Sequence, residues 1–254
     1  MHRAVPAVLL VALIALAGCG MLGDSQPPSD DRALEVRNET SDAIETVSAV
    51  QMSMDGDVSA SADGRSRSIA IDGEGVLNRT SRLMRMNTTV EGQSATSYLT
   101  NRTTYTKCPS PWGGWGAQDQ STDVEWLSLT PLGRQVELFE RTNVYWDGNA
   151  TIDGHDTAII VAYPSQETLS SLPGESQTDL ASADANVENI TAKLWVDQET
   201  SRPVRSLLQV QLSGDGGEAT ANVMIDYEDY GEGFHVGIPA IPDDEIRELG
   251  CPGT

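Results

Sequence analysis

Apolar and polar residues alternate along much of the chain, and this period of two is typical of β-strands that bury one face. The pattern is clear in 203–213, where Leu208, Val210 and Leu212 alternate with polar residues. The segments predicted to be strands are 66–78, 82–92, 96–107, 143–154, 155–164, 188–200, 203–213 and 218–231. Short turns join neighbouring segments, so we expect the strands to be antiparallel.

Apolar residues recur every three or four positions near the start of the chain, which predicts an amphipathic helix. This helix is expected over 34–50, with Ala43, Ile44, Val47 and Val50 on its apolar side. It precedes the first predicted strands.

Two further helices are predicted in the middle of the chain. Pro131 suits the first position of one helix, and Thr122 and Glu125 have the spacing of a capping box before it. Its inward side chains are expected to be Leu132, Val136 and Phe139. Ser165 is placed to cap a short helix over 166–172. The order helix, strands, helices, strands predicts an α+β fold, with helices covering one face of a single curved antiparallel sheet.

Glycine, proline and polar residues mark two expected loops. The first is 108–120, which contains Trp112 and Trp115 in a glycine-rich stretch, and the second is the acidic segment 173–187. The two tryptophans either contact a membrane or ligand, or fix the loop beside Cys108, and the second reading is favoured.

The first eighteen residues have the pattern of an export signal: Arg3 is followed by a short apolar run. The run ends in Leu16-Ala17-Gly18-Cys19, which matches the lipobox of prokaryotic lipoproteins. We therefore predict a lipoprotein signal peptide over 1–18 and lipid attachment to the Cys19 thiol. The alternative is an ordinary signal peptide with an incidental cysteine.

The predicted anchor implies a layout and a location. A flexible tether rich in Gly, Ser, Pro and Asp is expected over 19–33, and one domain over 34–254. The protein would be lipid-anchored at the cell membrane, with its domain on the extracellular face, because two acyl chains anchor a protein stably.

The charge of the chain is strongly acidic, with a formal net charge of -22. Lysine occurs twice, at Lys107 and Lys193, and the acidic residues are spread along the sequence. A dispersed acidic surface stays hydrated in high salt, which screens its self-repulsion. This composition predicts a halophilic and archaeal source, although an ordinary acidic secreted protein is the alternative. With no basic patch, we expect no nucleic-acid partner.

Two cysteines remain after Cys19. In an oxidising exterior, Cys108 and Cys251 favour a disulfide; the alternatives are two buried free thiols or a second acylation site. Exterior location also makes the six Asn-x-Ser/Thr sequons candidate glycosylation sites, and hence predicts a glycoprotein. They are Asn38, Asn78, Asn87, Asn101, Asn149 and Asn189.

Catalytic and metal-binding patterns are weak. His155 and Asp156 are neighbours on a predicted strand and face opposite ways, so they form a poor pair. No Gly-x-Ser-x-Gly elbow, phosphate loop, dinucleotide fingerprint or metal-ligand spacing occurs in the sequence. We therefore expect a protein that is not an enzyme and holds no metal or cofactor.

The last third of the chain carries a family resemblance. Its features are Trp195-Val196-Asp197 at a strand end, the turn from Thr200 to Arg205, Asp229-Tyr230-Gly231, and an exit at Ile238-Pro239. Over about 189–243 the sequence resembles the LolA-like superfamily of lipoprotein carriers, which includes the LppX/LprG lipid-binding lipoproteins. The resemblance implies a half-barrel, in which a curved sheet wraps around helices on its concave face and an apolar concavity holds acyl chains.

This resemblance implies that the protein binds a lipid or other amphiphile in an apolar cavity, for local transfer or sensing. Side chains on the apolar strand faces would then face the ligand: Met84, Met86, Leu208, Val210, Leu212, Val223 and Ile225. The alternative is a surface sensor or interaction lipoprotein on the same fold, which binds a membrane or surface protein and has a filled interior.

Overall fold

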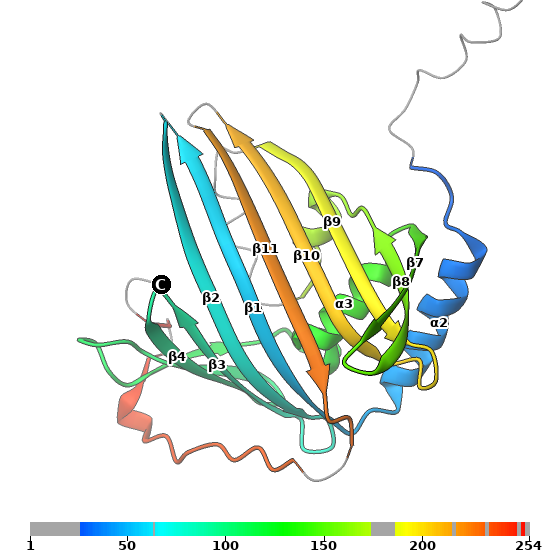
Figure 1. Ribbon diagram of the computed structural model, residues 1–254. Helices are drawn as coiled ribbons and strands as arrows, with labels where there is room; N and C mark the ends of the chain where they lie inside the picture. The colour runs from blue at the N-terminus through cyan, green and yellow to red at the C-terminus, as the bar shows by residue number, and fades with distance from the viewer. Residues whose placement is uncertain are drawn as a thin grey trace, which may run out of the picture.

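The alternating segments form one sheet of twelve strands in the computed structural model (Figure 1). The structure describes residues 26–62, 64–173, 186–214, 217–231, 234–247 and 250–251. The strands are β1 (Ala49–Ala62), β2 (Arg65–Asn78), β3 (Leu83–Val90), β4 (Gln93–Leu99), β5 (Thr103–Lys107), β6 (Trp115–Asp119), β7 (Val144–Ile152), β8 (His155–Ala162), β9 (Asn186–Asp197), β10 (Pro203–Gly214), β11 (Gly217–Glu228) and β12 (Ile246–Arg247).

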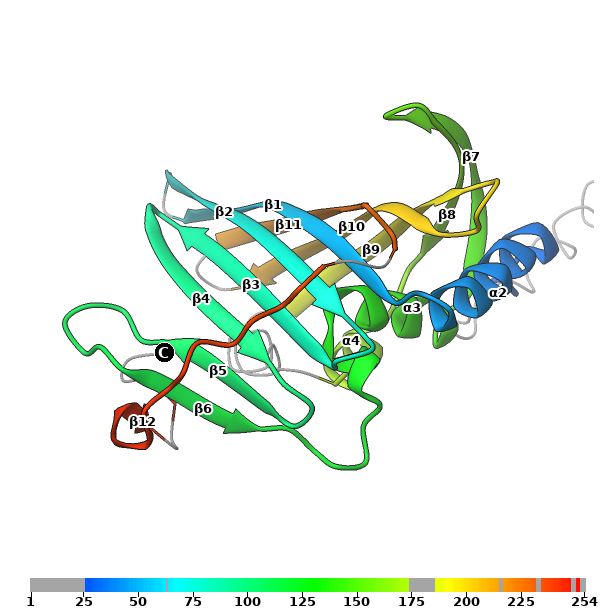
Figure 2. The same ribbon diagram turned by 90° about the horizontal axis from the view of Figure 1, so that it is seen from below.

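The sheet is two meanders joined through the pairing of β1 with β11. Its order is β12-β6-β5-β4-β3-β2-β1-β11-β10-β9-β8-β7. Every neighbouring pair is antiparallel except β12 with β6, which is parallel. Figure 2 shows that the sheet curves strongly and stays open between β12 and β7. The predicted α+β fold with one curved antiparallel sheet is confirmed.

Helices occupy the concave side and one end of this sheet. They are α2 (Asp31–Glu45), α3 (Pro131–Glu140) and α4 (Gln166–Ser170), together with the 3-10 turns η1 (Trp126–Leu129) and η2 (Asp243–Glu245). In Figure 2, α3 and α4 lie inside the curve and α2 lies at the β7–β8 end. The start of α3 follows the prediction for Pro131, but its cap is Thr130, whose hydroxyl oxygen accepts the Gly133 N–H at 3.2 Å.

Two clusters of buried side chains hold the helices to the sheet. One joins α3 residues Leu138 and Phe139 to Ile160 and Leu194 of β8 and β9. The other includes Leu132 of α3 and lies against β1 to β4; its members are Ile44, Val47, Val50, Met52, Leu77, Met84, Leu99, Trp126, Leu132 and Tyr227. Because α3 contributes to both clusters, it is fixed at each end over the middle of the sheet.

The first predicted helix is wrong at both ends. The helix α2 begins at Asp31 and ends at Glu45, and Ala49 and Val50 already belong to β1. Val50 is fully buried in the sheet, so its apolar spacing reflects packing on the sheet and not a continuing helix.

Three further elements differ from the prediction. Segment 96–107 holds parts of two strands, β4 and β5, and the predicted loop 108–120 contains β6. Thr122 and Glu125 form no capping box, since Glu125 precedes η1 without a side-chain hydrogen bond to it. The Ser165 cap is confirmed, because its hydroxyl oxygen accepts the Thr168 N–H at 3.0 Å.

Residues 26–33 of the predicted tether are bound to the domain. The Trp146 N–H donates to the Asp30 carboxylate at 2.9 Å, and the Val144 N–H donates to the Ser29 hydroxyl at 3.0 Å. The Arg32 guanidinium lies 3.4 Å from the Trp146 ring centroid. The signal peptide, Cys19 and the start of the tether lie outside the described residues. Among the helices that are described, none has the length and hydropathy needed to span a membrane.

Candidate functional site

A partly open cavity of about 400 Å³ lies between the concave face of the sheet and the helices α3 and α4. It borders the first buried cluster through Leu138 and Leu172 and lies where β10 and β11 face α3. The sheet supplies Met54, Ile71, Val187, Ile190, Ser206, Leu208, Val210, Val223 and Ile225. The helical side supplies Pro131, Arg134, Gln135, Leu138, Gln166, Leu169, Ser170 and Leu172.

Four of the seven predicted ligand-facing residues line this cavity: Leu208, Val210, Val223 and Ile225. They share one face of β10 and β11, because side chains two positions apart on a strand point the same way. Met84, Met86 and Leu212 are not among the lining residues. Met84 belongs to the second buried cluster. Met86 packs over β2, where a Cβ added at Gly75 would lie 2.7 Å from its sulfur.

Sequence reasoning missed the helical wall and the strand β1. Helical periodicity shows which side of a helix is apolar, and it cannot show which part of that side faces an empty volume. Met54 and Ile190 did carry a usable signal, since each follows the alternation of its own strand.

Polar groups gather mainly on the helical wall of the cavity. They come from Arg134 and Gln135 on α3 and from Gln166 and Ser170 on α4. Within the described residues, Arg134 is the one charged side chain in the lining. The sheet wall is apolar apart from Ser206.

The Ser206 hydroxyl is 3.1 Å from the buried Tyr227 hydroxyl, and the two share a hydrogen bond. Burial raises the pKa of Tyr227; the bond from Ser206 opposes this, and the nearby Asp226 adds to it. The Tyr227 hydroxyl therefore stays neutral and available for hydrogen bonding at ordinary pH.

A second pocket of about 440 Å³, lined mainly by polar residues, lies at one end of the sheet, where residues of β8, β9, β10 and β11 come together. In it, His155 Nδ1 lies 2.8 Å from the carboxylate of Asp197 on β9. The neighbouring Asp156 instead accepts a hydrogen bond from the Thr151 hydroxyl at 3.0 Å. His155 and Asp156 do not pair with each other, which confirms the prediction. The contact between His155 and Asp197 was not predicted, because it joins residues on two different strands. No group of three or more potential metal ligands occurs among the described residues.

Asp197 also closes the turn between β9 and β10. Its carboxylate accepts the N–H groups of Glu199 and Thr200 at 3.0 and 2.7 Å. Burial acts to raise the pKa of Asp197, but hydrogen bonds from His155, Thr200 and Glu199 outweigh it and hold the pKa below its usual value. The charged carboxylate is therefore favoured in the folded state.

Replacing Asp197 with asparagine is expected to lower the free energy of unfolding by about 1–2 kcal/mol near neutral pH. A carboxylate with a lowered folded pKa stabilises fully above its unfolded pKa of about 4, and this contribution is lost as pH falls through the folded pKa. Urea unfolding of both proteins between pH 7 and pH 3 measures the difference, which should shrink below about pH 4.

The control for this prediction is Asp156→Asn, a change at an exposed carboxylate on the adjoining strand, with an expected effect below about 0.5 kcal/mol. A difference between wild type and Asp197→Asn that stays constant down to pH 3 would contradict the role of the carboxylate charge.

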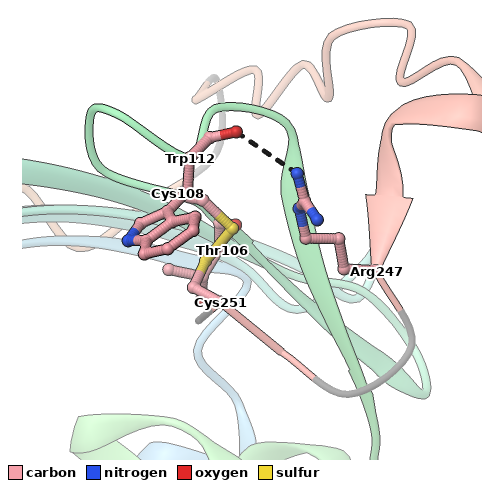
Figure 3. Close-up of a disulfide and its surroundings, with 5 residues drawn as sticks. All are labelled: Thr106, Cys108, Trp112, Arg247 and Cys251. Atoms are coloured by element: carbon pink, nitrogen blue, oxygen red, sulfur yellow. Dashed lines mark hydrogen bonds between the residues drawn. A yellow bond between two sulfur atoms is a disulfide. The ribbon is translucent and has the colours of Figure 1, made fainter. Parts of the chain in front are cut away.

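The predicted disulfide joins Cys108, just after β5, to Cys251 near the chain end, with the two Cα atoms 5.3 Å apart (Figure 3). The Arg247 guanidinium donates to the Trp112 carbonyl oxygen at 3.2 Å in the same region. The Trp112 side chain is 53% exposed, whereas Trp115 is buried and packs against the Tyr98 ring. The favoured role of the two tryptophans, to fix the loop beside Cys108, therefore fits the buried Trp115. The exposed Trp112 side chain does not show this role.

The candidate glycosylation sites differ in exposure. Asn78 is half-buried, and its Nδ2, the atom that would carry a glycan, donates to the Phe234 carbonyl oxygen at 2.9 Å. The remaining sequon asparagines are exposed: Asn38, Asn87, Asn101, Asn149 and Asn189. Glycosylation stays a prediction, with Asn78 the least accessible acceptor.

Comparison with known proteins gives matches among solved structures. No protein-family model matches the chain, and no curated protein does. The lipoprotein LppX from Mycobacterium tuberculosis aligns with a TM-score of 0.53 and 15% identity, covering 82% of this chain and 100% of LppX. LprF from Mycobacterium bovis aligns with a TM-score of 0.50 and 15% identity, covering 84% of this chain and 100% of LprF.

A LolA superfamily protein from Nitrosomonas europaea also aligns, over 84% of this chain and 98% of its own, at 10% identity and a TM-score of 0.32. At these identities the likeness concerns the fold. The open curved sheet with helices inside it matches the fold of LppX and LprF, as the resemblance implied.

Proposed function

We propose that the protein is a membrane-anchored, extracytoplasmic lipoprotein that binds a lipid or other amphiphile in the cavity under α3 and α4, for local transfer or sensing. The observation that carries this proposal is the apolar cavity of about 400 Å³ on the concave side of the sheet. This function requires binding and release and needs no catalytic step.

The cavity suits an apolar chain on physical grounds. Its volume falls within the range of about 300–1,000 Å³ that small-molecule pockets occupy, towards the lower end. Aliphatic side chains from β9, β10 and β11 form its sheet wall, and transfer of apolar surface from water to such a wall contributes roughly 25 cal/mol per Å². A single acyl or alkyl chain therefore fits better than a lipid with several long chains.

The proposed anchor would hold this cavity near a membrane. Six residues separate Cys19 from Gln26, and a fully extended segment of that length reaches about 25 Å. The Gln26 side-chain amide donates to the carbonyl oxygen of Tyr163. Tyr163 lies shortly before α4, whose first residue, Gln166, lines the cavity. The lipidated end would thus leave the domain beside the cavity wall.

Replacing Leu208 with tryptophan is expected to remove most of the bound amphiphile. The larger ring would occupy the cavity, and an overpacking cost of about 1–3 kcal/mol to the bound state would lower ligand affinity about 5- to 150-fold. The test uses the full chain with Cys19→Ser, so that no attached acyl chain competes for the cavity. Organic extraction of the purified protein and mass spectrometry measure the bound lipid per protein.

Leu207→Trp is the matched control, because Leu207 precedes Leu208 on β10 and its side chain points to the opposite face of the sheet. Lipid retained in Leu207→Trp and lost in Leu208→Trp supports the proposal. Equal lipid in both variants would place the ligand elsewhere. If the wild-type protein neither carries nor binds an amphiphile, the proposed function is contradicted. The alternative, a lipoprotein that binds a protein partner, would then be favoured.

A further inference from the structure

We infer that the ligand of this cavity has an anionic, hydrogen-bond-accepting head group, of which a carboxylate is the smallest example, and that Gln135 and Arg134 on α3 bind it. This inference rests on the proposed function, since it names the class of amphiphile that the same cavity selects. It follows from the polar groups of the helical wall.

Gln135 supplies the first argument. Its side chain is 8% exposed, it lines the cavity, and its amide Nε2 has no hydrogen-bond partner among the described residues. A buried donor without a partner is costly, and native structures contain few of them. An acceptor atom brought by the ligand would satisfy this N–H group, which an alkyl chain alone cannot do.

Arg134 supplies the second argument, which concerns charge. In a protein with a formal net charge of -22, the one charged side chain in the described lining of the cavity is a cation. Arg134 is half-buried, and charge–charge interactions strengthen where water is partly excluded. The net charge of the protein disfavours anions on average, whereas the cation in this wall favours a negative head group.

The position of both residues in α3 adds to the same preference. Arg134 and Gln135 follow Pro131 within the first turns of the helix, and no acidic residue lies in the first turn. The N-terminal end of a helix carries partial positive charge, which favours a nearby anion. The aliphatic residues of β10 and β11 opposite would then take the tail.

The test is isothermal titration calorimetry of the full chain carrying Cys19→Ser with dodecanoate, 1-dodecanol and dodecyltrimethylammonium, each below its micelle concentration. The three probes share a tail and differ in the head group. Wild type should bind dodecanoate about tenfold more tightly than the other two, as expected for a hydrogen bond to a charged group. Gln135→Leu and Arg134→Met should each remove most of this preference, because dodecanoate loses more binding free energy than dodecanol when its charged head group loses a partner.

Two further variants separate head-group recognition from misfolding. Arg141→Met removes the same charge at the end of α3, outside the cavity lining, and should keep the preference for dodecanoate. Gln135→Glu should shift the preference towards dodecyltrimethylammonium, because the new carboxylate repels dodecanoate and attracts the cation. Equal affinities of wild type for all three probes, or an unchanged preference in Gln135→Leu, would overturn the inference while leaving the proposed function standing. Failure of wild type to bind any probe would overturn both.

Discussion

Replacing Cys108 and Cys251 together with serine is expected to lower the free energy of unfolding by about 2–5 kcal/mol. The bond joins residues 143 positions apart, and a crosslink across a long stretch of chain removes much conformational freedom from the unfolded state. Among the described residues, the strand pairing that holds this segment is short, since β12 pairs with β6 over two residues. The effect is measured by urea unfolding of two proteins: the Cys19→Ser chain, and the same chain with Cys108 and Cys251 also replaced by serine.

The same variant should release the end of the chain before the rest of the sheet unfolds. Limited proteolysis is expected to cut the double-serine variant within 234–247, under conditions where the disulfide-bonded protein stays intact. A reducing agent should reproduce both effects in the parent chain and change nothing in the variant. A stability change below about 0.5 kcal/mol would mean that packing around β6 holds the chain end without the bond.

The disulfide was predictable from the sequence because it required only a count of cysteines and an oxidising setting. The strands β10 and β11 were predictable for a similar reason, since their pattern can be read from neighbouring residues. On β10, for example, Ser206, Leu208 and Val210 fall at every second position and so share one face. In contrast, β1 was missed although Met52 and Met54 alternate with polar residues. Its aspartates and glycine disfavour strands, but β1 pairs along its full length with β2 and over Gln51 to Ser61 with β11, and this pairing overrides the local preference.

The candidate site was only half predictable. The apolar sheet wall follows from strand periodicity, but the empty volume depends on how far α3 stands from the sheet. That distance is determined by contacts between remote residues, such as Leu138 and Phe139 with Ile160 and Leu194. The contact of His155 with Asp197 was hidden for the same reason, because it joins residues on different strands.

Replacing Gly133 with alanine is expected to lower the free energy of unfolding by about 3 kcal/mol and to weaken ligand binding. Helix propensity alone predicts the opposite, since alanine is favoured over glycine inside a helix by about 1 kcal/mol. However, a Cβ at Gly133 would lie 2.0 Å from the Leu127 carbonyl oxygen in η1. Neither backbone can rotate away, so α3 would have to move.

Movement of α3 would affect the cavity directly, because Arg134, Gln135 and Leu138 follow Gly133 in the same helix and line it. Thermal unfolding and dodecanoate titration of Gly133→Ala measure the two effects. Gly237→Ala is the matched control: its Cβ meets nothing within 4 Å, so stability should stay within about 0.5 kcal/mol of wild type. If Gly133→Ala proved as stable as this control and bound dodecanoate normally, the close approach of η1 to α3 would not be what sets the helical wall of the cavity.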